Sequence, residues 1–305
     1  MDDDITLLAE SVAAAALPDL AHDVEARSVL GSWRWARFLT KPPEEDAELG
    51  AALELWAPVA ENSPVALPSE VLPLLETYAV EQVSRHALEL AATYEVSNDP
   101  AGLDEAIDLF RDVVRDTPEG YPDRGRYLAN LGIALRSRFE ATGDLGVLDE
   151  AVGALREAAG AMLAEDTRLP LVLDGFGDVL LDRFGRSGNV ADVQEAVAAA
   201  EHAVGLAQES DPQFAVYLSH FGDALRLSFE YTEDTAALDR SIEVCRCAVS
   251  YAGEADLSRC LSHLGSALEV EFCLSGDRER LVEAIECFRR AVDVAAIDDA
   301  RSPPT

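Results

Sequence analysis

Three aspartates form the group of side chains best suited to bind a ligand: Asp174, Asp178 and Asp182 follow one another at intervals of four residues. In a helix this spacing places them in one row. Like charges at this spacing repel one another by a few tenths of a kcal/mol per pair, so the row favours a cationic ligand. One interpretation is a socket for the Lys or Arg side chains of a bound peptide. The other is a solvated face in a chain that is acidic throughout.

Further polar residues fall at equivalent positions of neighbouring units and complete a predicted partner-binding face. Asp223 extends the acidic row, and Arg136 and Arg226 either hold a carboxylate of the ligand or pair with the row itself. At the border of this face lie Arg85, Asn130, His220 and His263, which occupy the same position in different copies of a repeated unit. Histidine titrates near neutral pH and binds metals, but the pattern supplies no third ligand, so no metal site is predicted.

The sequence contains no catalytic signature. It has no glycine-rich phosphate loop, no metal-ligand spacing and no Ser, Cys or His constellation outside the packing pattern, so neither an enzyme nor a cofactor is predicted. Five cysteines lie in the last two units, without a CxxC pair: Cys245, Cys247, Cys260, Cys273 and Cys287. We expect them to be reduced and inert.

The charge of the chain limits the class of partner. Asp and Glu outnumber Lys and Arg by 58 to 24, which gives a formal net charge of −34. Nucleic acid and anionic membrane surfaces are therefore not expected as partners, because phosphate attraction drives binding to both. A protein or peptide with a basic segment fits better. An acidic N-terminus and the lack of an apolar run of about 18 residues predict neither a leader nor a membrane span, so we expect a cytoplasmic protein.

An internal repeat with a step of about 45 residues positions these side chains. Small residues recur at this step: Gly31, Ala87, Gly132, Gly177, Gly222 and Gly265. Seven residues after each stands an aromatic ring, which we expect to be buried: Phe38, Tyr94, Phe139, Phe184, Phe229 and Phe272. A fixed period of this kind is typical of a solenoid, in which each unit buries its apolar face against its neighbours.

Each unit is predicted to be two helices joined by a tight turn. In Thr142-Gly143-Asp144, for example, the glycine can adopt the left-handed backbone that ends one helix, and the aspartate can cap the next. The fold is therefore predicted to be all-α, a right-handed α-solenoid of about six helical hairpins. Because no polar capping helix follows the last hairpin, its outer face should be partly apolar and exposed.

The same pattern divides the chain. We expect an N-terminal capping helix over residues 1–21, a degenerate first repeat over 22–60 and a proline-containing insertion over 61–72 that forms a joint or a protruding loop. Five hairpins then occupy residues 73–297, and residues 298–305 form a disordered tail.

The spacing of Leu128, Leu131, Gly132 and Ala151 resembles the tetratricopeptide repeat (TPR), in an extended form in which Ala151 follows Gly132 by 19 residues. The longer unit, including YLANLGIALRSRFEATGDLGVLDEAV, looks like the repeat arrays of actinobacterial proteins that often carry a CHAT protease domain downstream. This resemblance implies a concave groove, formed by the first helices of the hairpins, that binds a peptide or protein segment.

These observations together predict a non-catalytic scaffold or adaptor that presents an acidic groove to a basic segment of another protein. The alternative is a regulatory or sensor module of a larger effector, such as a CHAT-type protease or a signalling ATPase. In that alternative the uncapped last hairpin docks a homodimer mate or a downstream domain.

Overall fold

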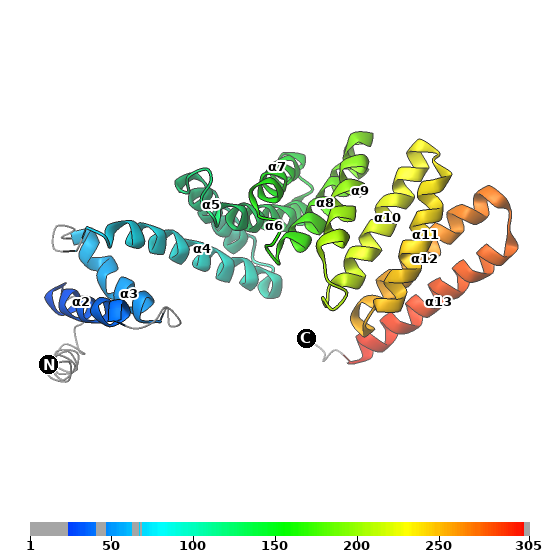
Figure 1. The fold of residues 1–305 in the computed structure, drawn as a ribbon. Helices are drawn as coiled ribbons and strands as arrows, with labels where there is room; N and C mark the ends of the chain where they lie inside the picture. Colours follow the sequence, from blue (N-terminus) through cyan, green and yellow to red (C-terminus); the bar gives the residue numbers. More distant parts are fainter. Residues whose placement is uncertain (1–23, 41–46, 63–66, 68, 302–305) are drawn as a thin grey trace. The chain divides into compact units, whose positions relative to one another are not determined.

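The computed structural model describes residues 24–40, 47–62, 67 and 69–301. In this part of the chain all regular secondary structure is helical, in twelve helices (Figure 1). The expected helix over residues 1–21 lies outside the described residues. The chain divides into two compact units, Met1–Glu89 and Leu90–Thr305. No helix in the described part is long and apolar enough to cross a bilayer.

The first unit contains a helical hairpin and the start of a longer helix. Its elements are α2 (Val24–Thr40), α3 (Ala47–Asn62) and the beginning of α4 (Leu72–Ser97). The core of the hairpin is the fully buried Trp56, and Leu67 and Val71 pack in the same cluster. The proline-containing segment predicted as a joint is therefore tied to the first hairpin by its apolar side chains. The boundary between the two units falls after Glu89, inside α4.

The second unit is a stack of hairpins. After the end of α4 it contains α5 (Pro100–Asp116), α6 (Arg124–Thr142), α7 (Leu145–Ala161), α8 (Leu169–Ser187), α9 (Val190–Leu206), α10 (Phe214–Thr232), α11 (Thr235–Tyr251), α12 (Glu254–Ser275) and α13 (Arg278–Arg301). The hairpins α6/α7, α8/α9, α10/α11 and α12/α13 follow one another, and each second helix also packs on the next first helix. First helices contact one another directly, α6 on α8, α8 on α10 and α10 on α12, and so form one continuous layer. Helix α13 extends into the segment predicted as a tail.

The turns inside the hairpins have the predicted caps. The residue after each first helix has a positive φ, between 52° and 72°: Asn98, Gly143, Gly188, Glu233 and Gly276. The next side chain caps the second helix, as when Asp144 Oδ1 accepts a hydrogen bond from the amide of Gly146 at 2.8 Å. Asp99, Asn189, Asp234 and Asp277 make the equivalent bond. These caps satisfy helix-end groups that would otherwise lack partners.

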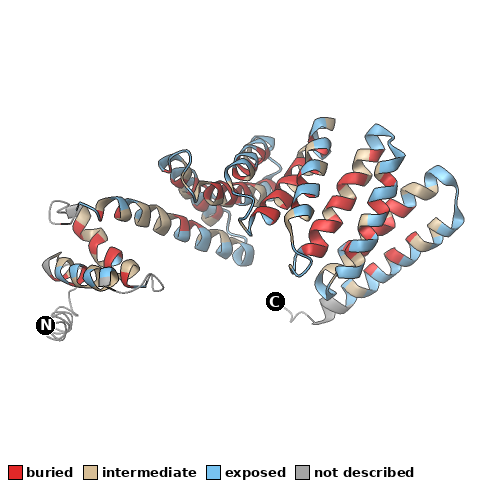
Figure 2. Cartoon of the chain, viewed as in Figure 1, coloured by how far each residue is buried: buried red, intermediate tan, exposed pale blue. Residues whose placement is uncertain are grey.

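The recurring small residues allow the two helices of a hairpin to approach closely. A β-carbon added to Gly132 would stand 2.5 Å from Cγ of Leu155, and one added to Gly222 would stand 2.3 Å from Sγ of Cys245. All six small residues are buried, and Figure 2 shows buried residues along the faces where helices of the second unit meet. Burial raises the pKa of Cys245 to about 12, which fits the predicted inert thiol.

The recurring aromatic rings are buried only in the hairpins inside the stack. Phe139, Phe184 and Phe229 are buried, as predicted, whereas Phe38, Tyr94 and Phe272 are only partly buried. The prediction that all six rings are buried is therefore wrong at these three positions. For Phe272 the reason is its place in the last hairpin, since no further first helix follows α13 in the described residues to cover the ring.

Candidate functional site

A polar cavity of about 250 Å³ lies on the layer of first helices. The residues that line it come from four helices: Arg136 of α6, Asp178, Leu181 and Asp182 of α8, His220 and Asp223 of α10, and Arg259 and His263 of α12. We call it the first-helix cavity. All of these residues except Leu181 and Arg259 were predicted from the sequence as partner-binding residues. Residues far apart in the sequence meet here because the repeat places equivalent positions side by side.

The aspartate row is paired within the protein. Nη1 of Arg136 donates to Oδ2 of Asp178 at 2.9 Å, and its Nε lies 3.7 Å from Oδ2 of Asp182. Burial alone would lower the pKa of Arg136, but the charges of Asp178 and Asp182 outweigh burial and raise it. Of the two roles predicted for this arginine, pairing with the row is the one observed. An incoming cation would have to exchange with it.

The other end of the row is held by a histidine from the next hairpin. Nδ1 of His220 donates to Oδ1 and Oδ2 of Asp174, at 3.0 and 3.1 Å, and lies 3.3 Å from Oδ1 of Asp178. Burial lowers the pKa of His220, but the hydrogen bond to Asp174 and the two aspartate charges outweigh it, so the pKa is raised. For Asp174 burial dominates and raises its pKa. The contact of His220 with Asp174 therefore links α8 to α10.

Asp174 does not face solvent, contrary to the sequence prediction. Its side chain is buried, as are Ala129 and Ser219 at the equivalent position of neighbouring units. The reason is that successive first helices pack directly on one another and cover this position. Ser219 Oγ lies 2.9 Å from Nδ1 of His263, which repeats the relationship of Asp174 to His220 one hairpin later. We call these two pairs the inter-repeat ladder.

The remaining predicted residues have separate surroundings. Nη2 of Arg226 donates to Oδ1 of Asp223 at 2.7 Å and the same guanidinium also pairs with Glu230. Asn130 is partly buried on α6 and does not line the first-helix cavity. Arg85 belongs to the first unit, where its Nη1 donates to Oε1 of Gln82 at 3.4 Å.

Arg259 is a cavity residue that the sequence prediction missed. Its Nη1 lies 3.4 Å from Nε2 of His220, and its Nη2 lies 3.7 Å from Oδ1 of Asp256. Arg259 occupies a position of its helix at which the residue type varies from unit to unit. The repeat alignment could therefore have indicated it as a partner-binding residue. Its charge lowers the pKa of His220, against the larger effect of the aspartates.

One group in the site has the composition of a metal-ligand set. Asp174, Asp178 and His220 each offer a ligand atom, and these atoms lie within 4.8 Å of one another. Two carboxylates and one imidazole suit a divalent transition metal. Arg136 already places positive charge against Asp178, and Nδ1 of His220 is already in contact with Asp174, so a metal ion would compete with both contacts. That no metal resides here stays a prediction.

Comparison with known proteins identifies the fold. No protein-family model matches the chain, and no curated protein matches it. Two crystal structures of the nearly identical TPR-like repeats of a protein described as a kinesin light chain, from Podosopora anserina, are 18% identical to it, with TM-scores of 0.50 and 0.51. Both alignments cover 72% of this chain, and they cover 99% and 98% of those chains. This chain has a TPR-like solenoid fold.

A further similar structure is MamA residues 41 to the end, from Desulfovibrio magneticus RS-1, with 17% identity and a TM-score of 0.46 over 71% of this chain and 97% of that chain. At these identities the similarity concerns the fold. The predicted fold class and the resemblance to the TPR are confirmed. The comparisons give no support for the actinobacterial type or for an association with CHAT domains.

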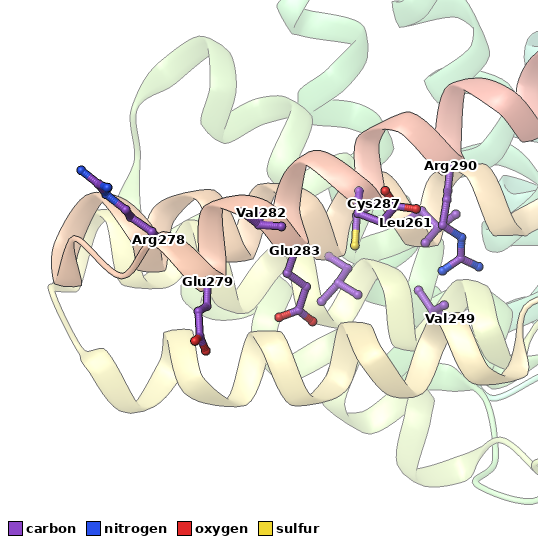
Figure 3. A pocket seen from close by; sticks show the side chains of 10 residues that line it. Val249, Leu261, Arg278, Glu279, Val282, Glu283, Cys287 and Arg290 are labelled. Atoms are coloured by element: carbon purple, nitrogen blue, oxygen red, sulfur yellow. The ribbon is translucent and has the colours of Figure 1, made fainter.

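The TPR-like solenoid has a second cavity, of about 620 Å³, in its last hairpin. Val249 of α11, Leu261 of α12 and Cys287 of α13 supply its apolar lining, with Glu283 and Arg290 beside them (Figure 3). Two valines on α13 are largely exposed, Val282 at 67% and Val292 at 68%. The sequence prediction of an exposed, partly apolar face on the last hairpin is confirmed for the described residues.

Proposed function

We propose that this chain is a non-catalytic scaffold that binds a segment of another protein along its layer of first helices. The observation that supports this best is the contrast between packing and lining positions. Equivalent packing positions hold the same kind of residue in successive hairpins, as at Leu135, Leu180, Leu225 and Leu268, all buried. The lining positions vary more along the array, since the position of Asp182 holds Ser137, Leu227 and Val270 in the other hairpins, and lining residues meet in the first-helix cavity. Variable residues on a constant frame are how solenoids present specific binding surfaces.

The proposed partner carries a basic segment. The chain has a formal net charge of −34, which attracts cationic polypeptides over long range at low salt. Within the cavity, the side chains of Asp178 and Asp182 remain 19% and 39% exposed beside Arg136. A partner's Lys or Arg can therefore share or replace that pairing. Five free thiols favour the reducing cytoplasm as the compartment in which this occurs.

Site-specific crosslinking tests this function. A photoreactive p-benzoylphenylalanine at Leu181, inside the first-helix cavity, should capture a discrete protein from a lysate of the native host. The same amino acid at Glu243, exposed on α11 and outside the cavity, is the matched control. Both proteins should keep the thermal melting of the wild type. Equal capture from the two positions, or none from Leu181, would refute the proposal.

A second candidate function uses the last hairpin. The cavity of Figure 3 and the exposed Val282 and Val292 form a surface on which a second copy or an effector domain can dock, which would make the chain a regulatory module. Val282→Glu and Val292→Glu should then abolish self-association in sedimentation experiments, or binding of the effector. The scaffold function would be unaffected, because both valines lie outside the first-helix cavity.

A further inference from the structure

A recurring contact seals the junctions between first helices. The aromatic ring of one hairpin meets the side chain that stands nine positions after the small residue of the next hairpin. At the first of these junctions Arg186 of α8 lies over the ring of Phe139 of α6, with 5.8 Å from guanidinium carbon to ring centroid. At the second, Tyr231 of α10 meets Phe184 of α8 edge-on, at 4.6 Å between centroids. A guanidinium and an aromatic ring are both favourable neighbours for a phenylalanine.

The third junction has neither a guanidinium nor a ring at this position. The equivalent pair is Phe229 of α10 and Leu274 of α12; Phe229 is buried, at 7% exposure, and Leu274 is 57% exposed, close to the 52% of Tyr231. A cavity of about 720 Å³ remains, lined by Phe229, Glu230, Glu233, Thr235, Glu269, Val270, Cys273 and Leu274. We call it the ring pocket. Its volume lies within the range of small-molecule and side-chain binding pockets.

Carboxylates gather at this junction and not at the other two. The positions of Glu230, Glu233 and Glu269 are occupied by Glu140, Gly143 and Leu181 at the first junction, and by Gly185, Gly188 and Arg226 at the second. Glu230 pairs with Arg226. Among the described residues, no cation lies within ion-pair distance of Glu233 or Glu269. The acidic charge is therefore concentrated where the chain supplies neither a guanidinium nor a ring of its own.

Glu233 is held in an unfavourable backbone conformation. Its φ is 57°, in the left-handed region, where three of the other hairpins have Gly143, Gly188 and Gly276. A residue with a β-carbon is less stable there than glycine. Local strain of this kind is concentrated at functional sites, where the side chain has a use that offsets it. At this position the side chain adds a carboxylate to the ring pocket.

We propose that the ring pocket binds an arginine side chain from a basic segment of a partner protein. The guanidinium lies over Phe229, as Arg186 lies over Phe139, and pairs with Glu233 and Glu269. The aliphatic part of the arginine contacts Val270 and Leu274. This inference rests on the proposed function, because it names a chemical group by which the scaffold recognises its partner.

Two exposed cysteines allow the site to be located directly. Cys273 lines the ring pocket, whereas Cys247 is exposed on α11 outside it. The probe is the peptide acetyl-Gly-Leu-Arg-Leu-Arg-Gly-amide, with a matched peptide in which citrulline replaces both arginines, which removes the charge and exchanges one donor nitrogen for a carbonyl oxygen. The arginine peptide should slow alkylation of Cys273 by iodoacetamide roughly fivefold and leave Cys247 unchanged, as read by mass spectrometry. Equal protection of Cys273 by the two peptides would overturn the proposal.

Two variants test the lining of the ring pocket by fluorescence anisotropy with the labelled arginine peptide. Leu274→Tyr introduces the ring found at Tyr231, and the double variant Glu233→Gly/Glu269→Gln removes both unpaired carboxylates. Each should weaken binding by roughly tenfold or more, with melting preserved. The control Glu243→Gln, an exposed acid elsewhere, should stay within about twofold of the wild type.

Unchanged affinity in the double variant would overturn the arginine site. If a partner is still crosslinked at Leu181 in that case, the scaffold function stands and only the ring pocket is removed. If the ring pocket binds the peptide but Leu181 captures nothing, the scaffold function along the first-helix cavity fails on its own.

Discussion

His220 of α10 donates from Nδ1 to both carboxylate oxygens of Asp174 of α8, at 3.0 and 3.1 Å, and thereby joins two consecutive repeats through a buried aspartate. Removing the histidine leaves this carboxylate without its partner. We expect His220→Gln to lower the free energy of unfolding by about 2–3 kcal/mol near pH 6, because a buried charge that loses its partner is strongly destabilising. Urea unfolding measures this. The control is His202→Gln, an exposed histidine on α9, which should change little.

The same pair makes stability depend on pH. The pKa of His220 is raised from its ordinary value of 6.5, so the folded state binds this proton more tightly than the unfolded chain does. The resulting stabilisation is complete below 6.5 and is lost as the pH rises through the folded pKa. The difference in unfolding free energy between the wild type and His220→Gln should therefore shrink from about pH 6 to about pH 8.

His263 titrates in the opposite sense, because burial lowers its pKa. Its contribution is present above its ordinary pKa and is lost as the pH falls through the folded value. The charge of His220 is one of the causes that lower the pKa of His263, so the difference between the wild type and His220→Gln also contains a smaller contribution from His263. A difference that stays constant across the pH range would show that His220 is not protonated in the folded state.

The glycines at the hairpin contacts should respond differently to alanine. At Gly132 the new methyl group would stand 2.5 Å from Cγ of Leu155. We expect a net loss of about 1–2 kcal/mol, since crowding of a packed core exceeds the helix-propensity gain of about 1 kcal/mol. At Gly177 the nearest atom is the carbonyl oxygen of Ala196 at 3.6 Å, an ordinary contact, so Gly177→Ala should be neutral or stabilising. Thermal melting compares the two, and equal effects would contradict the close contact at Gly132.

Replacing Glu233 with glycine should stabilise the protein. Its left-handed φ of 57° suits glycine, so Glu233→Gly should raise the free energy of unfolding by about 1 kcal/mol. The control Glu243→Gly places glycine in the middle of α11, where it should cost about 1 kcal/mol. Chemical denaturation of both variants gives the comparison. A destabilised Glu233→Gly would mean that the carboxylate makes a compensating interaction in the free protein.

The rings inside and at the end of the stack should differ in importance. Phe184 is buried and in edge contact with Tyr231, so Phe184→Ala should cost about 3–5 kcal/mol. Phe272 is partly exposed, so Phe272→Ala should cost about 1–2 kcal/mol. Equilibrium unfolding of the two variants tests the order. A larger effect at Phe272 would imply that another molecule or segment covers the last hairpin.

Divalent metals should leave the protein unaffected. Arg136 and His220 already compensate the carboxylates of Asp174 and Asp178, so added zinc or EDTA should shift the melting temperature by less than about 1 °C. A ligand at about a hundred times its dissociation constant would add roughly 2.7 kcal/mol. A clear rise with zinc that disappears in His220→Gln would establish a metal site.

Much of the fold was predictable because each unit repeats one pattern. The helix-ending turn at Gly143 and Asp144 and the buried leucines at Leu135 and its equivalents follow from local propensity and helical period, both of which are present in the sequence. The burial of Phe272 was overestimated, since its column says nothing about whether a following unit covers it.

Most residues of the candidate site could be predicted from the sequence, but the partners with which they pair could not. The sequence prediction considered one helix at a time and therefore placed Asp174 on a free face. In the structure the contact between α8 and α10 covers this residue. Arg136 likewise had two possible partners, and only its distance from Asp178 decides between them. The ring pocket lies where Leu274 takes the place of Arg186 and Tyr231, and that these side chains meet the ring of the preceding hairpin becomes apparent only in space.

The inter-repeat ladder bears on how such an array can change in length. His220 and His263 occupy the same position in adjacent hairpins, so excising the hairpin α10/α11 would bring His263 opposite Asp174. The shortened array would keep a charged partner for its buried acid. A hairpin can therefore be gained or lost without leaving the buried aspartate unpaired, which is the contact where a mismatch between neighbouring hairpins would destabilise the fold most.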